Sequence, residues 1–170
     1  EEKSAVAENG YAKASGEDYV FDFGVRVIAG ARLSAPGYYG RILGAADTAN
    51  IEEVVWGGIR QAHQRARINA RLKSQAKGRF SSLGGSLGGT DLAPVAVVQD
   101  SAPATYTVDP RGVPLSETVR MAVDGCKAAQ GQSGNIAYAA ASTSTFLLRE
   151  LFLSSDGADI DQSFAQTEGF

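Results

Sequence analysis

The chemistry-bearing residues of this sequence are few: it has one histidine, His63, and one cysteine, Cys126. A zinc site needs three or four ligands drawn mainly from His and Cys, with carboxylates as minor contributors. No pair of histidines and no pair of cysteines exists here, so the sequence predicts no self-contained zinc centre. His63 lies in a basic segment, where a surface or packing role is favoured over metal binding.

A nucleophilic relay is equally unsupported. A serine or cysteine nucleophile needs a base that is itself oriented by a third group. His63 is the only histidine base available, and no sequence feature brings it near Cys126. Because Cys126 falls on the apolar stripe of a predicted helix, we expect a buried, unreactive thiol.

The glycine-rich residues 84–89 (GGSLGG) resemble a phosphate-binding loop only in composition. They lack the Lys-Ser or Lys-Thr ending of a P-loop, and neither a clear strand before them nor a helix after them is predicted. We interpret this segment as a surface loop.

A basic run is the sharpest electrostatic feature of the sequence. No acidic residue interrupts its members, which are Arg60, Arg65, Arg67, Arg71, Lys73, Lys77 and Arg79. On a helix such charges usually form a solvated face. The functional alternative is a basic patch that meets nucleic acid or an acidic partner, although no interleaved aromatic residues support base stacking.

A cluster of aspartates, Asp156, Asp159 and Asp161, follows a predicted strand near the C-terminal end. A calcium loop would need a further ligand and a different glycine position. Turn formation explains Asp156, and solvent exposure explains the other two. The sequence thus nominates no catalytic, cofactor-binding or metal-binding residue.

Two helices are predicted. Residues 50–74 place apolar side chains at helical spacing after a capping Asn50, although the pair Gly57-Gly58 weakens the middle unless a neighbour packs closely there. The second helix follows Pro114, has Ser116 as its candidate cap and extends to about Ala129.

The predicted strands are mainly antiparallel. Residues 19–28 alternate and pair with 37–43 as a hairpin, and a short strand is expected at 95–98. Residues 135–142, 146–153 and 158–170 predict a three-stranded meander, with a tight turn at Asp156-Gly157. We expect an α/β (α+β) fold: a mixed, largely antiparallel sheet with two main helices packed on it.

Composition bounds the class of protein. The 170 residues are 44% hydrophobic and 21% charged with a net charge of −3, which is typical of one globular domain and disfavours a surface devoted to nucleic acid. No apolar run could span a bilayer, and no secretory signal opens the chain. A single cysteine suits a reducing compartment, so a cytoplasmic location is expected.

Domain organisation is predicted from the same patterns. Residues 1–18 are polar and are expected to be a flexible lead-in, with one domain over 19–170. The chain starts without Met and stops at Phe170 within a strand-like segment. We therefore expect it to be a piece of a longer protein.

Four short motifs, in order, resemble the TldD/PmbA family. They are residues 23–30 (FGVRVIAG), 37–40 (GYYG), 115–119 (LSETV) and 154–157 (SSDG) followed by 160–163 (IDQS). A helix beginning near Ile51 has its counterpart in the family as well. The segment 60–92 is longer than the usual family connection, and no role for it is predicted.

The resemblance implies an N-terminal, non-catalytic domain of a metalloprotease subunit, in a family historically described as a modulator of DNA gyrase. Its expected partners are its own C-terminal domain, a paired homologous subunit and a peptide substrate, with no membrane. The family's zinc helix, His-Glu-x-x-x-His, belongs to the C-terminal domain and is absent here. Zinc is therefore expected in that missing domain or in the partner subunit, with no cofactor in this chain.

Two other hypotheses remain open at this stage. One is a module that binds nucleic acid or another partner through the basic helix 60–79. The other is a purely structural dimerisation domain.

Overall fold

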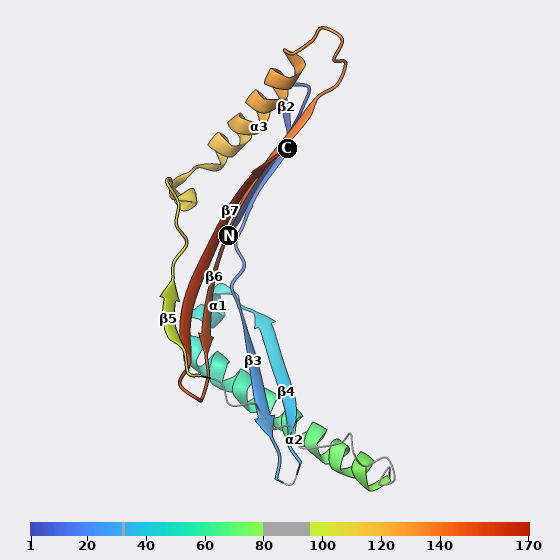
Figure 1. Cartoon of the computed structure of the whole chain (residues 1–170), viewed down its shortest axis with the longest axis vertical. Coiled ribbons are helices and arrows are strands. Elements are labelled where there is room, and N and C mark those ends of the chain that lie inside the picture. Colours follow the sequence, from blue (N-terminus) through green and yellow to red (C-terminus); the bar gives the residue numbers. More distant parts are fainter. Residues whose placement is uncertain (32, 80–95) are drawn as a thin grey trace. The chain divides into compact units, whose positions relative to one another are not determined.

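The computed structural model describes residues 1–31, 33–79 and 96–170, with side chains described up to Ala76 in the second of these ranges (Figure 1). The chain divides into two compact units. Unit 1 comprises Glu1–Tyr19 and Ala96–Phe170, and unit 2 comprises Val20–Val95. Residues 19–170, expected as one domain, therefore contribute to both units.

Unit 1 is built on a five-stranded sheet with the order β2-β1-β6-β7-β5. Its strands are β1 (Glu2–Glu8), β2 (Tyr11–Asp18), β5 (Gln99–Ala102), β6 (Ala140–Leu153) and β7 (Asp159–Gly169). All neighbours are antiparallel except β5 and β7, which run parallel. The predicted mixed, largely antiparallel α+β fold is confirmed.

The flexible lead-in predicted for residues 1–18 is wrong, because these residues form the hairpin β1–β2. Asn9 and Gly10 both have positive φ, 49° and 78°, as a two-residue hairpin turn between Glu8 and Tyr11 requires. β1 then pairs along its whole length with β6. This pairing, with a strand more than 130 residues away in the sequence, fixes β1 in the sheet. The polar sequence of residues 1–18 gives no sign of so distant a partner.

The C-terminal meander was predicted with one strand too many. Residues 146–153 are not a separate strand, because β6 runs unbroken from Ala140 to Leu153 and residues 135–139 precede it. The hairpin to β7 is confirmed, but only Gly157 in its loop has positive φ, 100°. The short strand expected at 95–98 starts instead at Gln99 as β5, and residue 95 lies outside the described residues.

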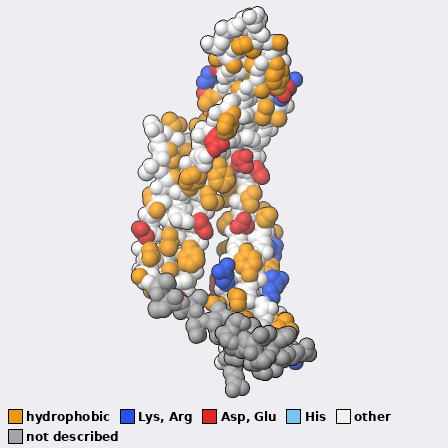
Figure 2. Space-filling view, turned by 45° about the vertical axis from the view of Figure 1, so that its right-hand side comes forward, with side chains coloured by type: hydrophobic (Ala, Val, Ile, Leu, Met, Phe, Trp, Pro, Cys, Tyr) orange, Lys and Arg blue, Asp and Glu red, His pale blue; other side chains and the backbone are white. Residues whose placement is uncertain are grey.

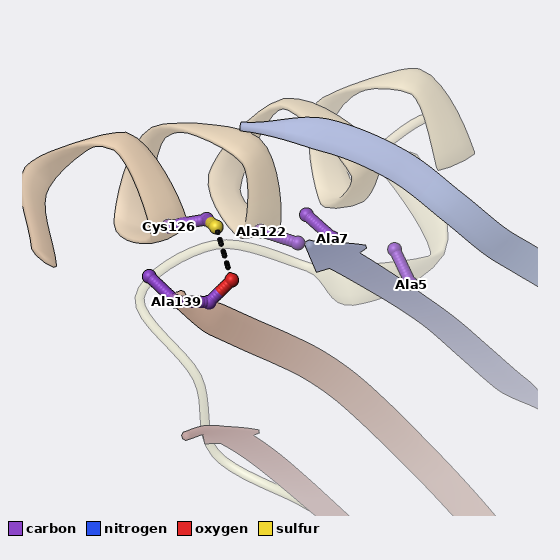
Figure 3. Close-up of a cluster of buried hydrophobic side chains, with 5 residues drawn as sticks. All are labelled: Ala5, Ala7, Ala122, Cys126 and Ala139. Carbon is purple, nitrogen blue, oxygen red and sulfur yellow. Dashed lines mark hydrogen bonds between the residues drawn. The ribbon is translucent and has the colours of Figure 1, made fainter. Parts of the chain in front are cut away.

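One helix, α3 (Leu115–Gln130), packs against β1 and β6 and follows a single 3-10 turn, η2 (Pro110–Gly112). Its N-cap position is taken by Pro114, and Ser116 lies inside the first turn. The core beneath it consists of small residues, namely Ala5, Ala7, Ala122, Cys126 and Ala139 (Figure 3). Small side chains on both sides allow the helix to approach the sheet closely.

Unit 2 is a hairpin and a long helix. β3 (Asp22–Ala29) pairs antiparallel with β4 (Ala35–Ile42), which confirms the predicted hairpin. A short helix, α1 (Ala45–Thr48), leads into α2 (Ile51–Arg79), which confirms the predicted helix and extends it beyond residue 74. α2 packs against both strands.

The buried stripe of α2 is made of Gly58, Ala62, Ala66 and Ala70, spaced four residues apart. A Cβ on Gly37 of β4 would lie 2.2 Å from the Ala62 carbonyl oxygen and 2.3 Å from the Ala66 nitrogen. The backbones of the strand and the helix are thus in contact at this point. Gly58 is needed for a similar reason, since a Cβ there would lie 2.7 Å from the Phe23 ring.

None of the helices in the described ranges is both long enough and apolar enough to cross a lipid bilayer.

Candidate functional site

The two residues with the most versatile chemistry lie in different units. His63 is exposed on α2 of unit 2, and Cys126 is fully buried on α3 of unit 1. Within residues 1–31, 33–79 and 96–170, no group of three or more His, Cys, Asp or Glu side chains is arranged to hold a metal ion.

The Cys126 thiol takes part in two structural hydrogen bonds. Its Sγ donates to the Ala139 carbonyl at 3.1 Å (Figure 3). It also accepts from the Gly10 N–H at 3.1 Å. The side chain thereby joins α3 to the β1–β2 turn and to the residue before β6. The predicted buried thiol is confirmed.

The glycine-rich segment 84–89 lies outside the described residues.

Two members of the basic run support the hairpin of unit 2. The Arg65 guanidinium donates to the Tyr38 carbonyl at 2.7 Å and lies 5.6 Å from the centre of the Tyr39 ring. Lys73 donates to the Ser34 carbonyl at 3.2 Å. Two of the seven members of the basic run therefore hold the β3–β4 hairpin against α2.

Three other arginines, Arg60, Arg67 and Arg71, are exposed. At about 100° per residue they fall on one face of α2, roughly 120° around the helix from the Ala62–Ala66–Ala70 stripe. None of the three forms an ion pair with another residue in the described ranges. Lys and Arg side chains of this unit are visible at the lower right of Figure 2. The side chains of Lys77 and Arg79 are outside the described set.

A shallow hollow lies at the N-terminal end of α2, where Asn50, Glu53, Trp56 and Arg60 line it. Trp56 is 53% exposed, so the indole forms part of the surface. The carboxylates at this helix end match the helix dipole and disfavour an anion there.

The C-terminal aspartates do not converge on a common point. Asp161 accepts two hydrogen bonds from Arg149 across the β6–β7 ladder, at 3.0 and 2.7 Å. These bonds hold the pKa of the Asp161 carboxyl below its usual value. Asp161 is therefore part of a surface ion pair.

A buried lysine, which the sequence did not single out, is the most enclosed charge in the described ranges. The Lys3 side chain is 6% exposed, and its Nζ donates to the carbonyls of Pro110, Arg111 and Val113 at 3.3, 3.2 and 2.9 Å. The carboxylates of Glu1 and Glu17 lie 3.3 and 3.5 Å away. The sequence signal that could have identified Lys3 is its spacing: it lies two residues before Ala5, so in a strand it shares the buried face of β1 with Ala5 and Ala7.

The segment 109–113, which precedes α3, is also held by exposed side chains. Asp109 accepts from the backbone and side chain of Arg111, and Arg111 also donates to the Tyr106 hydroxyl at 2.8 Å. The hydrogen bonds from Arg111 lower the pKa of Asp109 to about 2. Lys3 and Asp109 together fix the chain that enters α3.

The edges of the five-stranded sheet are one place where this fold can engage another molecule. β2 and β5 are the outer strands of the five-stranded sheet, and every residue of both is exposed. Free strand edges offer unpaired N–H and C=O groups that an extended peptide can bind. This recognition needs no titratable cluster.

No family model, no curated protein and no solved structure matches the chain.

The oxygen cage around Lys3 generates a stability prediction. Lys3→Met should lower the free energy of unfolding by about 2–4 kcal/mol, because three carbonyls lose a charged hydrogen-bond donor and two carboxylates lose their cation. Urea unfolding followed by circular dichroism measures this change.

The matched control is Lys13→Met on β2. The Lys13 side chain is 55% exposed and lies 3.8 Å from Glu8, so its removal should change stability by less than about 1 kcal/mol. Equal effects of the two substitutions would show that the cage around Lys3 does not stabilise the fold.

Proposed function

We propose that this chain is the N-terminal, non-catalytic domain of a TldD/PmbA-type zinc metalloprotease subunit that acts in the cytoplasm. The observation that carries the proposal is the position of the quoted motifs. Residues 24–27 (GVRV) lie in β3, residues 37–40 (GYYG) lie beside them in β4, and residues 154–157 (SSDG) form the loop between β6 and β7. Each motif thus occupies a distinct structural element.

The proposed role is to help form the peptide-binding cleft and the subunit interface. Zinc and the catalytic residues would come from the subunit's C-terminal domain or from a paired homologous subunit. The free edges of β2 and β5 support a part in holding extended peptides through backbone hydrogen bonds. A structural use of Cys126 and Lys3 agrees with a domain that carries no reaction of its own.

The first test reads the coding sequence that follows Phe170 and measures the metal content of the intact protein. We expect a second domain of several hundred residues, and stoichiometric zinc in that subunit or its partner. The second domain should carry two histidines with a glutamate between them if the subunit is the zinc-bearing kind. The absence of any second domain would contradict the proposal.

A second candidate function is binding of nucleic acid, favoured by the exposure of Arg60, Arg67 and Arg71, which form no ion pair with the residues that the structure describes. Because Arg65 supports the β3–β4 hairpin, a loss of DNA binding on its replacement could result from destabilised folding. Arg67→Glu is the cleaner variant, and anisotropy of a labelled DNA duplex at several salt concentrations is the measurement.

If phosphates contact this face, Arg67→Glu should weaken binding and reduce the slope of log affinity against log salt by about 1. Arg120→Glu, a charge reversal on an exposed arginine of α3, is the control and should leave that slope unchanged. No retention of the unmodified chain on DNA at low salt would remove this candidate.

A further inference from the structure

The five-stranded sheet has one face that carries α3 and one that does not. Ala5, Ala7 and Thr143 face the helix, because the first two belong to its core and the Thr143 hydroxyl donates to the Thr118 carbonyl at 3.0 Å. Side chains alternate along a strand. The even-numbered side chains of β6 therefore point to the other side, which we call the open face.

Large apolar side chains form a stripe on the open face. Three of the four even-numbered positions from 146 to 152 of β6 are apolar, with Glu150 as the fourth: Phe146, Leu148 and Phe152, which are 41%, 46% and 52% exposed. Phe164 and Ile160 of β7 lie opposite Leu148 and Phe152 in the ladder, and Phe164 is 52% exposed. A stripe of this kind on a sheet marks a surface built to be covered.

The stripe has a shallow hollow at its centre. Leu148 and Phe164 form its apolar wall, and the rest of the lining is Ala102, Glu150, Gln162 and Ser163. The Gln162 amide donates to the Glu150 carboxylate at 2.9 Å, so this acid is oriented beside the hollow by a neutral partner. A side chain that enters the hollow therefore meets both apolar surface and a negative charge.

Only acidic charges surround the stripe. Four carboxylates lie on the open face at register positions next to it, on β1, β5, β6 and β7: Glu2, Asp100, Glu150 and Glu168. None of them forms an ion pair within the described ranges. On these four strands, whose residues are all described, no Lys or Arg occupies an open-face position.

The charge of the whole unit has the same sign. Unit 1 contains six Lys and Arg residues against fourteen Asp and Glu residues, a net charge of −8, whereas the full chain has −3. A partner that covers the stripe must therefore be apolar along one side and positively charged at its margins.

We propose that the open face of unit 1 binds a basic amphipathic helix of a partner protein. The stripe from Phe146 to Phe152 spans six residues, about 20 Å at about 3.3 Å per residue. A helix of about 13 residues covers that length. Its apolar side would pack on Phe146, Leu148 and Phe164, while its Lys or Arg residues would meet the four carboxylates. This surface lies on the chain's own strands, whichever family the chain belongs to.

Three labelled peptides of 14 residues, titrated with the full chain in low salt and followed by fluorescence anisotropy, test this assignment. The first combines Leu and Lys at helical spacing, the second replaces Lys with Glu, and the third has the composition of the first in strict alternation. We expect saturable 1:1 binding of the first, and binding at least tenfold weaker for the other two.

Paired variants locate the binding surface. The double variant Leu148→Ser/Phe164→Ser should weaken binding of the first peptide at least tenfold. The single variant Glu150→Lys should do the same. Leu151→Ser is the control, because Leu151 is 61% exposed but lies on the opposite face, and it should change affinity less than twofold. Circular dichroism establishes that each variant is folded.

Several results would overturn the assignment. Equal binding of the Glu peptide would remove the charge complementarity, and equal binding of the alternating peptide would indicate pairing at a strand edge. Unchanged affinity of the double serine variant would place the site elsewhere. A dimer seen by light scattering and abolished by that variant would assign the open face to a second copy of this chain.

Discussion

Close approach between helix and sheet is the constraint on which the rest of this structure depends. In unit 2 the backbone of β4 touches the backbone of α2, which only Gly37 permits. In unit 1 the helix α3 rests on alanines of β1, with Cys126 as the largest apolar side chain of the fully buried set. Such contacts are short and well packed, and they bury little apolar surface for each residue.

Because both helix–sheet interfaces are built from small side chains, many of the large apolar side chains lie on the surface. Phe146, Leu148 and Phe164 lie on a sheet face without a helix, while polar groups that could do chemistry serve the fold. Lys3 holds the loop before α3, and Arg65 holds the β3–β4 hairpin. In this structure the named polar groups therefore serve the fold, and large apolar side chains lie at the surface.

Sequence patterns predicted the elements that local periodicity defines, including both main helices and the β3–β4 hairpin. They missed β1 and β2, although Asn9-Gly10 is a strong hairpin signal, because that segment is polar and its partner β6 is remote in sequence. That no zinc-ligand set was predicted followed from composition, since the chain has one histidine and one cysteine. The open face could not be predicted, since it depends on which side of the sheet α3 covers.

The most direct test of close approach compares urea unfolding of Gly37→Ala and Gly57→Ala, followed by the fluorescence of Trp56, the chain's one tryptophan. The nearest atom to a Cβ on Gly57 would be an Arg60 nitrogen, 4.0 Å away. Gly57→Ala should therefore stabilise α2 by about 1 kcal/mol, whereas Gly37→Ala should destabilise unit 2 by at least about 2 kcal/mol. Wild-type stability in Gly37→Ala would contradict the account.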